Sequence, residues 1–379
     1  MSALAADSFG FDAERQRLAR ELFTTRLRLG IARSAGFGVA ILVFLLSGTS
    51  TALRDWAGDG TWWNVFAYFT VLYFALWVAG LPFSLVGHRL EVRYGLSRQT
   101  WRGWGFDDAK SLAIGYGLTL VAVEVLYWLL REFPAIWWLI VWVLGIGVSV
   151  AASVVAPVLF LRIFYKSNRL DNPELEARLK ALAERAGVRV LGVHVVQSST
   201  KSTRSNAALA GAGRTRRIVL TDTLLKTHGH DEIETILAHE LAHQKHRDPA
   251  VGFAMFILTS LVSLAALQAI LPWAAGFLGF RGIADVAGLP ILMLATGILS
   301  LAFDPVERAL SRWRESRADR TALEITGKPE AFASAMVKLH DANLSLARPP
   351  RFIEFLLMTH PAAWRRVSAA REFPGRALK

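Results

Sequence analysis

The chain has no cysteine among its 379 residues. Disulfide bonds are therefore excluded, and so are metal sites and catalytic mechanisms that depend on a thiolate. Any metal site in this protein must be built from histidine and carboxylate side chains. Charged residues are also scarce, at 20% of the chain, whereas 53% of the residues are hydrophobic and the mean hydropathy is +0.35. This composition argues against a purely soluble protein.

The hydrophobic residues are concentrated in long stretches that contain almost no formal charge. A helix needs about 20 apolar residues to cross the hydrocarbon core of a bilayer, whereas a helix in a soluble core keeps a charged face. The stretches of suitable length, the third of which contains Glu124, are residues 34–53, 60–87, 111–130, 133–161, 249–280 and 286–303. We therefore predict six transmembrane helices. The longest two either extend beyond the bilayer or break at Pro157 or Pro272.

Arginine and lysine are distributed unequally around the predicted spans. The segment before the first span is rich in arginine, and the second connection contains Arg89, Arg93, Arg98, Arg102 and Lys110. The alternate connections contain one basic residue each, which is Arg54, Arg131 or Arg281. Because basic residues favour the cytoplasmic side, both termini and the segments 162–248 and 304–379 are predicted to be cytoplasmic, and the three poorly basic connections lie on the other side. The net charge of +12 then reflects topology and attraction to anionic lipid, and no nucleic-acid partner is expected.

The predicted spans divide the chain into four parts: residues 1–161, with the N-terminal tail and four spans, a cytoplasmic segment 162–248, two further spans in 249–303, and a cytoplasmic segment 304–379. In the second part, the pattern predicts a helix from Asn172 to Gly187, strands at 188–196 and 217–221, and a helix from Asp231 to His246. In the last part, one helix continues out of the final span to Gly327, and others cover about 329–344 and 361–371. The fold class is mainly α, with a polytopic membrane part and a cytoplasmic α+β domain.

Residues 239–243 have the sequence H-E-L-A-H, on the helix predicted from Asp231. A spacing of four places His239 and His243 on one face, one turn apart, where both imidazoles can bind the same tetrahedral zinc. Glu240 lies beside them and is suited to take a proton from the attacking water and pass it to the leaving amine. By itself so short a motif is only suggestive, and the alternative is two surface histidines on an amphipathic helix.

Catalytic zinc needs a third protein ligand and an open position for water. The best candidates are Glu315 and Asp319, which are four residues apart on a predicted helix. One carboxylate can bind the metal while the other orients a ligand. The alternative is a solvated helix face on which both carboxylates pair with the arginines at 312, 314 and 317.

These residues belong to a series of motifs that resembles the CAAX prenyl protease 1 family, membrane-embedded zinc endopeptidases of the gluzincin type. The resemblance extends from about residue 79 to the C-terminus. In order, the motifs are A-G-L-P-F-S at 79–84, Y-G-L-S-R-Q-T at 94–100, S-N-A at 205–207, R-I-V-L-T-D-T-L-L at 217–225, H-E-L-A-H, S-R-x-x-E-x-x-A-D at 311–319 and T-H-P at 359–361. Their joint occurrence is much stronger evidence than H-E-L-A-H alone.

The resemblance implies a role for each matching residue of the metal site. Glu315 is the third ligand of one zinc ion per chain, after His239 and His243. Asp319 is the partner that supports a ligand, and Glu240 is the general base.

Further implied roles concern the substrate. Asn206 and Ala207 lie near an edge strand that pairs with the backbone of an extended peptide. His360 and Arg366 stabilise the developing oxyanion or its neighbours.

The resemblance also implies a fold in which tilted helices enclose a large water-filled chamber capped by the protease domain. Such a chamber would accommodate Glu124, because a carboxylate within a span is costly unless it faces water or a partner. A hydrogen bond between two helices is the alternative for Glu124. Seven spans are usual in the eukaryotic members, so six or seven spans are expected.

The implied activity is hydrolysis of prenylated CAAX-type or other membrane-associated peptides, so the partners are a peptide or protein substrate and the lipid bilayer. Two alternatives stay open: a membrane-protein quality-control metalloprotease of the heat-shock type, and a non-enzymatic membrane protein. The chain departs from the family at Ala362, where a proline is usual, and at Arg314, where an aromatic residue is usual. These departures concern substrate preference and leave the zinc chemistry intact.

Overall fold

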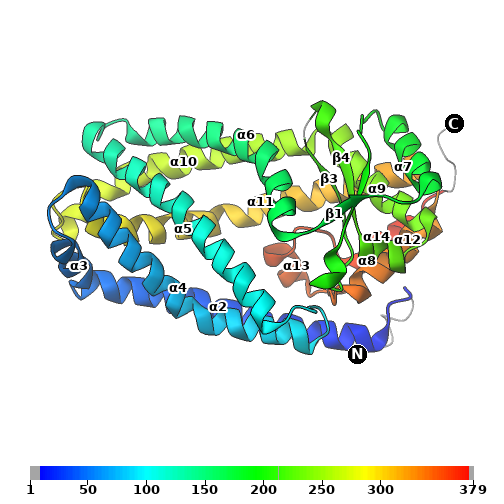
Figure 1. Cartoon of the computed structure of the whole chain (residues 1–379), viewed down its shortest axis with the longest axis horizontal. Helices are drawn as coiled ribbons and strands as arrows, with labels where there is room; N and C mark the ends of the chain where they lie inside the picture. The colour runs from blue at the N-terminus through cyan, green and yellow to red at the C-terminus, as the bar shows by residue number, and fades with distance from the viewer. Residues whose placement is uncertain (1–8, 212, 375–379) are drawn as a thin grey trace.

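The computed structural model describes residues 9–211 and 213–374. The molecule is elongated, with long helices running along its length and a small sheet with shorter helices at one end (Figure 1). The first turns of α2 lie at the same end as the sheet, and the side chain of Gln16 donates a hydrogen bond of 2.9 Å to Asp341 there. Arg371 Nη2 donates a hydrogen bond of 3.3 Å to the carbonyl of Phe9, so the beginning of the described chain lies against its last helix.

Six helices in the described residues are long and apolar enough to cross a membrane, which confirms the predicted number of spans. They are α2 (Ala13–Leu46), α4 (Thr61–Arg93), α5 (Trp101–Glu132), α6 (Trp137–Phe164), α10 (Asp248–Phe277) and α11 (Leu289–Thr326). Large apolar side chains on them point outward, for example Leu118 and Leu301, which are 71% and 72% exposed. A surface of this kind is stable only against lipid.

The ends of the spans differ in detail from the prediction. The first span stops at Leu46 rather than at residue 53, because Gly48 adopts a left-handed conformation with φ of 77° and a separate short helix follows, α3 (Thr49–Ala57). Neither long helix breaks: α6 is continuous past residue 157, and α10 is continuous through Pro272. Of the two predicted alternatives, extension of the helices therefore holds, and a break at proline does not.

Helix α11 is much longer than a bilayer requires. Its 38 residues extend about 57 Å at 1.5 Å per residue, compared with a hydrocarbon core of about 30 Å. The N-terminal half is apolar, whereas the C-terminal half carries Glu315 and Asp319 and ends at Gly327, which has φ of 64°. One rigid helix thus connects the membrane part to the candidate site.

The sheet has four short strands, β1 (Ser167–Arg169), β2 (Val193–Val196), β3 (Ala207–Ala210) and β4 (Arg217–Thr221), in the order β1-β2-β4-β3. Strands β2 and β4 are parallel, and β3 is antiparallel to β4 at the edge. The prediction was right for β4, too long for β2, and missed β1 and β3 as strands. The alanine-rich β3 has little intrinsic strand preference, so tertiary pairing must decide its conformation.

The remaining helices pack around this sheet. They are α7 (Pro173–Arg185), α8 (Asp222–Thr227), α9 (His230–Lys245), α12 (Pro329–Ala342), α13 (Arg351–Leu357) and α14 (Ala363–Arg371), with 3-10 turns at Ser198–Thr200, Gly213–Thr215 and Val286–Gly288. Asn172, where the predicted helix begins, caps α7 by accepting a hydrogen bond of 3.0 Å from the Leu175 N–H. The short α8 and α13 were not predicted.

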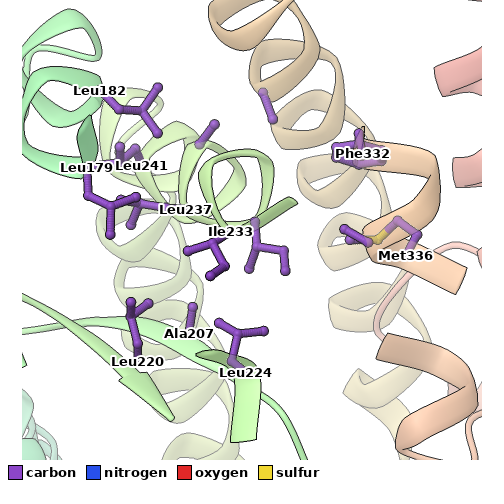
Figure 2. Close-up of a cluster of buried hydrophobic side chains, with 14 of the residues drawn as sticks. Leu179, Leu182, Ala207, Leu220, Leu224, Ile233, Leu237, Leu241, Phe332 and Met336 are labelled. Carbon is purple, nitrogen blue, oxygen red and sulfur yellow. The ribbon is translucent and has the colours of Figure 1, made fainter. Parts of the chain in front are cut away.

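The buried cluster at the end of the molecule that contains the sheet holds α9 in place (Figure 2). Leu237 and Leu241 on α9 are fully buried against leucines of α7 and β4. On another side of α9, Phe332 and Met336 of α12 complete the cluster. Burial of each such side chain contributes about 1.5–3 kcal/mol, so this packing fixes the rotation of α9 and hence the direction of its histidines.

Glu124 lies on α5, within a predicted span. Its Oε2 atom is buried and makes no hydrogen bond to the described residues. That oxygen therefore gives no support to the alternative of a hydrogen bond between two helices.

Candidate metal centre

Helix α9 presents His239 and His243 on one face. Their rings are 4.7 Å apart between centroids, and the two Nε2 atoms approach to 3.2 Å. Two ring nitrogens that face each other at this distance converge on one point. This is the arrangement that a spacing of four residues predicts on a helix.

Glu315 completes the cluster from α11. Its Oε2 lies 3.1 Å from His239 Nε2, and its Oε1 lies 3.4 Å from His243 Nε2. The residue is 8% exposed. The ligand atoms of the three residues all lie within 4.8 Å of one another. The structure thus brings together the three residues that the sequence singled out as ligands.

This donor set fits zinc. Ligand atoms that share a tetrahedral zinc at 2.0–2.1 Å lie about 3.3–3.4 Å from one another, close to the distances of 3.1, 3.2 and 3.4 Å found here. Two imidazoles and one carboxylate form a common set for catalytic zinc, which leaves one position open for water.

Asp319 and Arg366 support His239 from behind. Asp319 Oδ1 lies 2.8 Å from His239 Nδ1, which directs the other nitrogen, Nε2, towards the cluster. Arg366 donates hydrogen bonds of 2.6 and 2.7 Å to the two oxygens of Asp319. Its guanidinium therefore contacts Asp319 most closely, and its Nη2 is 3.5 Å from His239 Nδ1.

His243 has an equivalent partner that the sequence analysis missed. Asp248 Oδ2 lies 2.8 Å from His243 Nδ1, and Arg317 donates a hydrogen bond to Asp248 Oδ1. The signal that would have found it is an aspartate five residues after the second histidine, at the first position of α10.

Burial and neighbouring carboxylates control the proton affinity of α9 side chains. Burial lowers the pKa of His239, but with no metal bound the hydrogen bonds to Asp319 and Glu315 outweigh burial and raise the pKa to about 9. Burial raises the pKa of Glu240 and outweighs the charges of His239 and His243, which lower it. Glu240 is thus a stronger base than an exposed glutamate, as general-base chemistry requires.

A cavity of about 620 Å³ opens beside the cluster, and we call it the groove. Its lining includes Glu240, His360 and Arg366, together with Asn206 and Ala207 at the start of the edge strand β3. The backbone of Asn206 is fixed by Thr221, whose N–H donates to the Asn206 carbonyl at 3.0 Å, and the Asn206 residue is exposed. Within residues 9–211 and 213–374, β3 pairs only with β4, so an open strand edge lies next to the candidate metal ligands.

His360 reaches the cluster from the loop after α13. Its side chain is 54% exposed, and its Nε2 lies 3.3 Å from Glu315 Oε2. Arg312 of α11 holds this segment through hydrogen bonds to three backbone carbonyls, those of Glu354, Phe355 and Met358. The position of His360 is thus tied to the helix that carries Glu315.

The two residues at which this chain departs from the resembled family, Ala362 and Arg314, both make hydrogen bonds in this structure. The N–H of Ala362 donates a hydrogen bond of 3.1 Å to Glu354 Oε1, which a proline could not do. Arg314 Nη1 donates to the carbonyl of Asp248 at 3.2 Å. Both residues therefore hold together the elements that surround the cluster.

Comparison with known families accounts for nearly the whole chain. The pattern of "Peptidase family M48" matches residues 169–373, and that of "CAAX prenyl protease N-terminal, five membrane helices" matches residues 9–166. In the second region the structure has four membrane-length helices, α2, α4, α5 and α6, together with the short α3.

Individual proteins are similar over different parts of the chain. An uncharacterized metalloprotease of Bacillus subtilis, YhfN, is 29% identical and covers 86% of this chain and 79% of its own length. CAAX prenyl protease 1 of Saccharomyces cerevisiae is 28% identical, and the match covers 76% of this chain and 68% of that protein. A protease HtpX homolog of Pyrococcus abyssi is 30% identical, and the match covers 53% of this chain and 74% of that protein. The crystal structure of S. mikatae Ste24p has the same fold, with a TM-score of 0.85 and 22% identity over 96% of this chain and 90% of that one.

Proposed function

Because this chain belongs to peptidase family M48 and is a membrane-embedded metalloendopeptidase, we propose that its metal is zinc, held by His239, His243 and Glu315. The observation that carries the proposal is the convergence of three ligand atoms within 4.8 Å, next to a groove lined by Glu240. The enzyme acts on peptide or protein substrates in a membrane.

Zinc in this position would polarise the substrate carbonyl and lower the pKa of a bound water. Glu240 accepts the proton of the attacking water, which is favoured by the raised pKa of this glutamate. It then donates that proton to the amide nitrogen of the scissile bond, so that the amine leaves uncharged. Glu240 is therefore both base and acid in one turnover.

Three residues are proposed to complete the machinery. Asp319, held by Arg366, keeps Nδ1 of His239 protonated and its Nε2 free for the metal. Through this contact Arg366 acts as a positioning residue. His360 borders the groove and can donate a hydrogen bond to the carbonyl oxygen as negative charge develops there.

The substrate is proposed to bind as an extended peptide along β3. Asn206 and Ala207 line the groove at the start of this edge strand. A peptide paired with the edge presents its carbonyl groups at regular spacing, which positions one of them for attack.

We propose that the substrates include prenylated C-terminal tails and that the site faces the cytoplasm. The match to CAAX prenyl protease 1 of S. cerevisiae, which covers 76% of the chain, supports the first point. The excess of arginine and lysine around the ends of alternate spans supports the second.

A second candidate is a quality-control protease for membrane proteins. It is supported by the similarity to an HtpX homolog over 53% of the chain. Cleavage of a prenylated peptide at one defined bond, with no cleavage of an unfolded membrane protein, would exclude it.

One experiment tests the proposal. Zinc content and cleavage of a quenched prenylated peptide are measured for the purified parent and for Glu240→Gln. We expect about one zinc per chain in both proteins, and peptide cleavage by the parent alone. The parent should lose this activity when a chelator removes the metal. Full activity of Glu240→Gln would refute the mechanism, and a parent without zinc would refute the metal assignment.

A further inference from the structure

Asp248 connects the candidate metal centre to a membrane helix. It is the first residue of α10, is 5% exposed, and accepts a hydrogen bond of 2.8 Å from His243 Nδ1. The preceding residue, Arg247, is in the left-handed conformation with φ of 56°. This conformation is uncommon outside glycine, and here it lets the chain turn between α9 and α10 within two residues. The turn places the carboxylate of Asp248 against α9, the helix that carries His243.

The other oxygen of Asp248 binds a third helix. Arg317 of α11 donates to Oδ1, while Arg314 of the same helix donates to the Asp248 backbone carbonyl at 3.2 Å. Glu315, the proposed third ligand, lies between these two arginines in the sequence. Asp248 therefore contacts the proposed ligand His243 directly. Through the two arginines it also contacts α11, the helix that carries Glu315.

From this geometry we infer that Asp248 is a positioning residue for the metal, which sets the tautomer of His243 and couples the metal centre to the first turn of α10. With the Asp248 carboxylate on Nδ1, Nε2 is the nitrogen of His243 that is directed at the cluster. The inference rests on the proposed zinc site. Asp248 lies outside the described lining of the groove, so it contributes to metal binding without contacting substrate.

Three full-length variants test the inference: Asp248→Ala, Asp248→Asn and the control Glu234→Gln. Glu234 is a matched control because it is a buried carboxylate on α9 with two cationic partners, Arg178 and Lys328, and no contact to the histidines. Zinc affinity is measured by competition with a chelating dye, and cobalt(II) absorption reports the ligand geometry.

We expect zinc affinity to fall about 10–100-fold in Asp248→Ala and less in Asp248→Asn, which keeps one acceptor oxygen. The absorption spectrum of the cobalt(II) protein should change in both Asp248 variants. At saturating zinc, their KM for the peptide should stay within twofold of the parent value. Glu234→Gln should keep the zinc affinity and the cobalt spectrum of the parent. Should Asp248→Ala not fold, Asp248→Asn decides.

The inference is overturned if the Asp248 variants bind zinc within twofold of the parent, or if Glu234→Gln loses as much affinity as they do. A parent that binds no zinc would instead refute the proposed function, so the two failures are distinguishable.

Discussion

Arg366 holds Asp319 with two arms of its guanidinium, Nε at 2.7 Å and Nη2 at 2.6 Å, in a place where both residues are buried. A buried ion pair of this kind is not necessarily stabilising as a whole, but removal of one partner leaves an uncompensated charge. The pair also stands behind His239, so its loss should affect both folding and metal binding.

Arg366→Ala is therefore expected to destabilise the protein by about 3–5 kcal/mol and to lower its zinc content. The measurement is the unfolding midpoint in detergent, together with bound zinc. The double variant Asp319→Asn/Arg366→Gln removes both charges and should recover part of the stability. An Arg366→Ala protein that unfolds at the parent temperature would contradict the expectation.

Asn206→Ala tests whether the side-chain amide of Asn206 binds the substrate beside β3, because the backbone N–H and carbonyl of this residue already bond Thr221. Loss of one side-chain hydrogen bond to the peptide should raise KM about tenfold, corresponding to about 1.4 kcal/mol, with kcat and zinc content changed much less. Asn168→Ala is the matched control, since Asn168 is an exposed asparagine on β1, the opposite edge of the sheet. Equal kinetic effects of the two substitutions would count against the assignment.

Ala362→Pro tests the departure from the resembled family. The backbone φ of −53° at Ala362 is compatible with proline, so the main cost is the lost N–H bond to the buried carboxylate of Glu354. We expect destabilisation of about 1.5–3 kcal/mol, measured as the unfolding midpoint, and unchanged zinc content. A variant as stable as the parent would mean that this hydrogen bond contributes nothing net.

His340 gives the stability a dependence on pH. Burial and then the charge of Arg366 lower the pKa of this histidine to about 4, below the unfolded value of about 6.5. The neutral form of His340 is thus favoured in the folded state. Its contribution to the free energy of unfolding is complete above pH 6.5 and is lost as the pH falls towards 4. The slope is at most about 1.4 kcal/mol per pH unit. His340→Gln should flatten the unfolding profile between pH 6.5 and 4, and an identical profile would refute this origin.

Local patterns predicted much of the architecture because they depend on neighbours in the sequence. The six spans follow from length and hydropathy, and helix α7 follows from its cap at Asn172 and the glycine at 187. The strand β3 and the helix α13 were missed because short segments take their conformation from the elements they pack against.

The sequence by itself determined that His239 and His243 share one helix face, since a spacing of four residues fixes their relation through backbone geometry alone. It also placed Glu315 and Asp319 on one face of another helix. Only the tertiary structure brought the two faces together, because the approach of α9 and α11 depends on burial of a common core. For the same reason the contact of Asp248 with His243 arises from a left-handed turn and the packing of three helices, which local spacing does not encode.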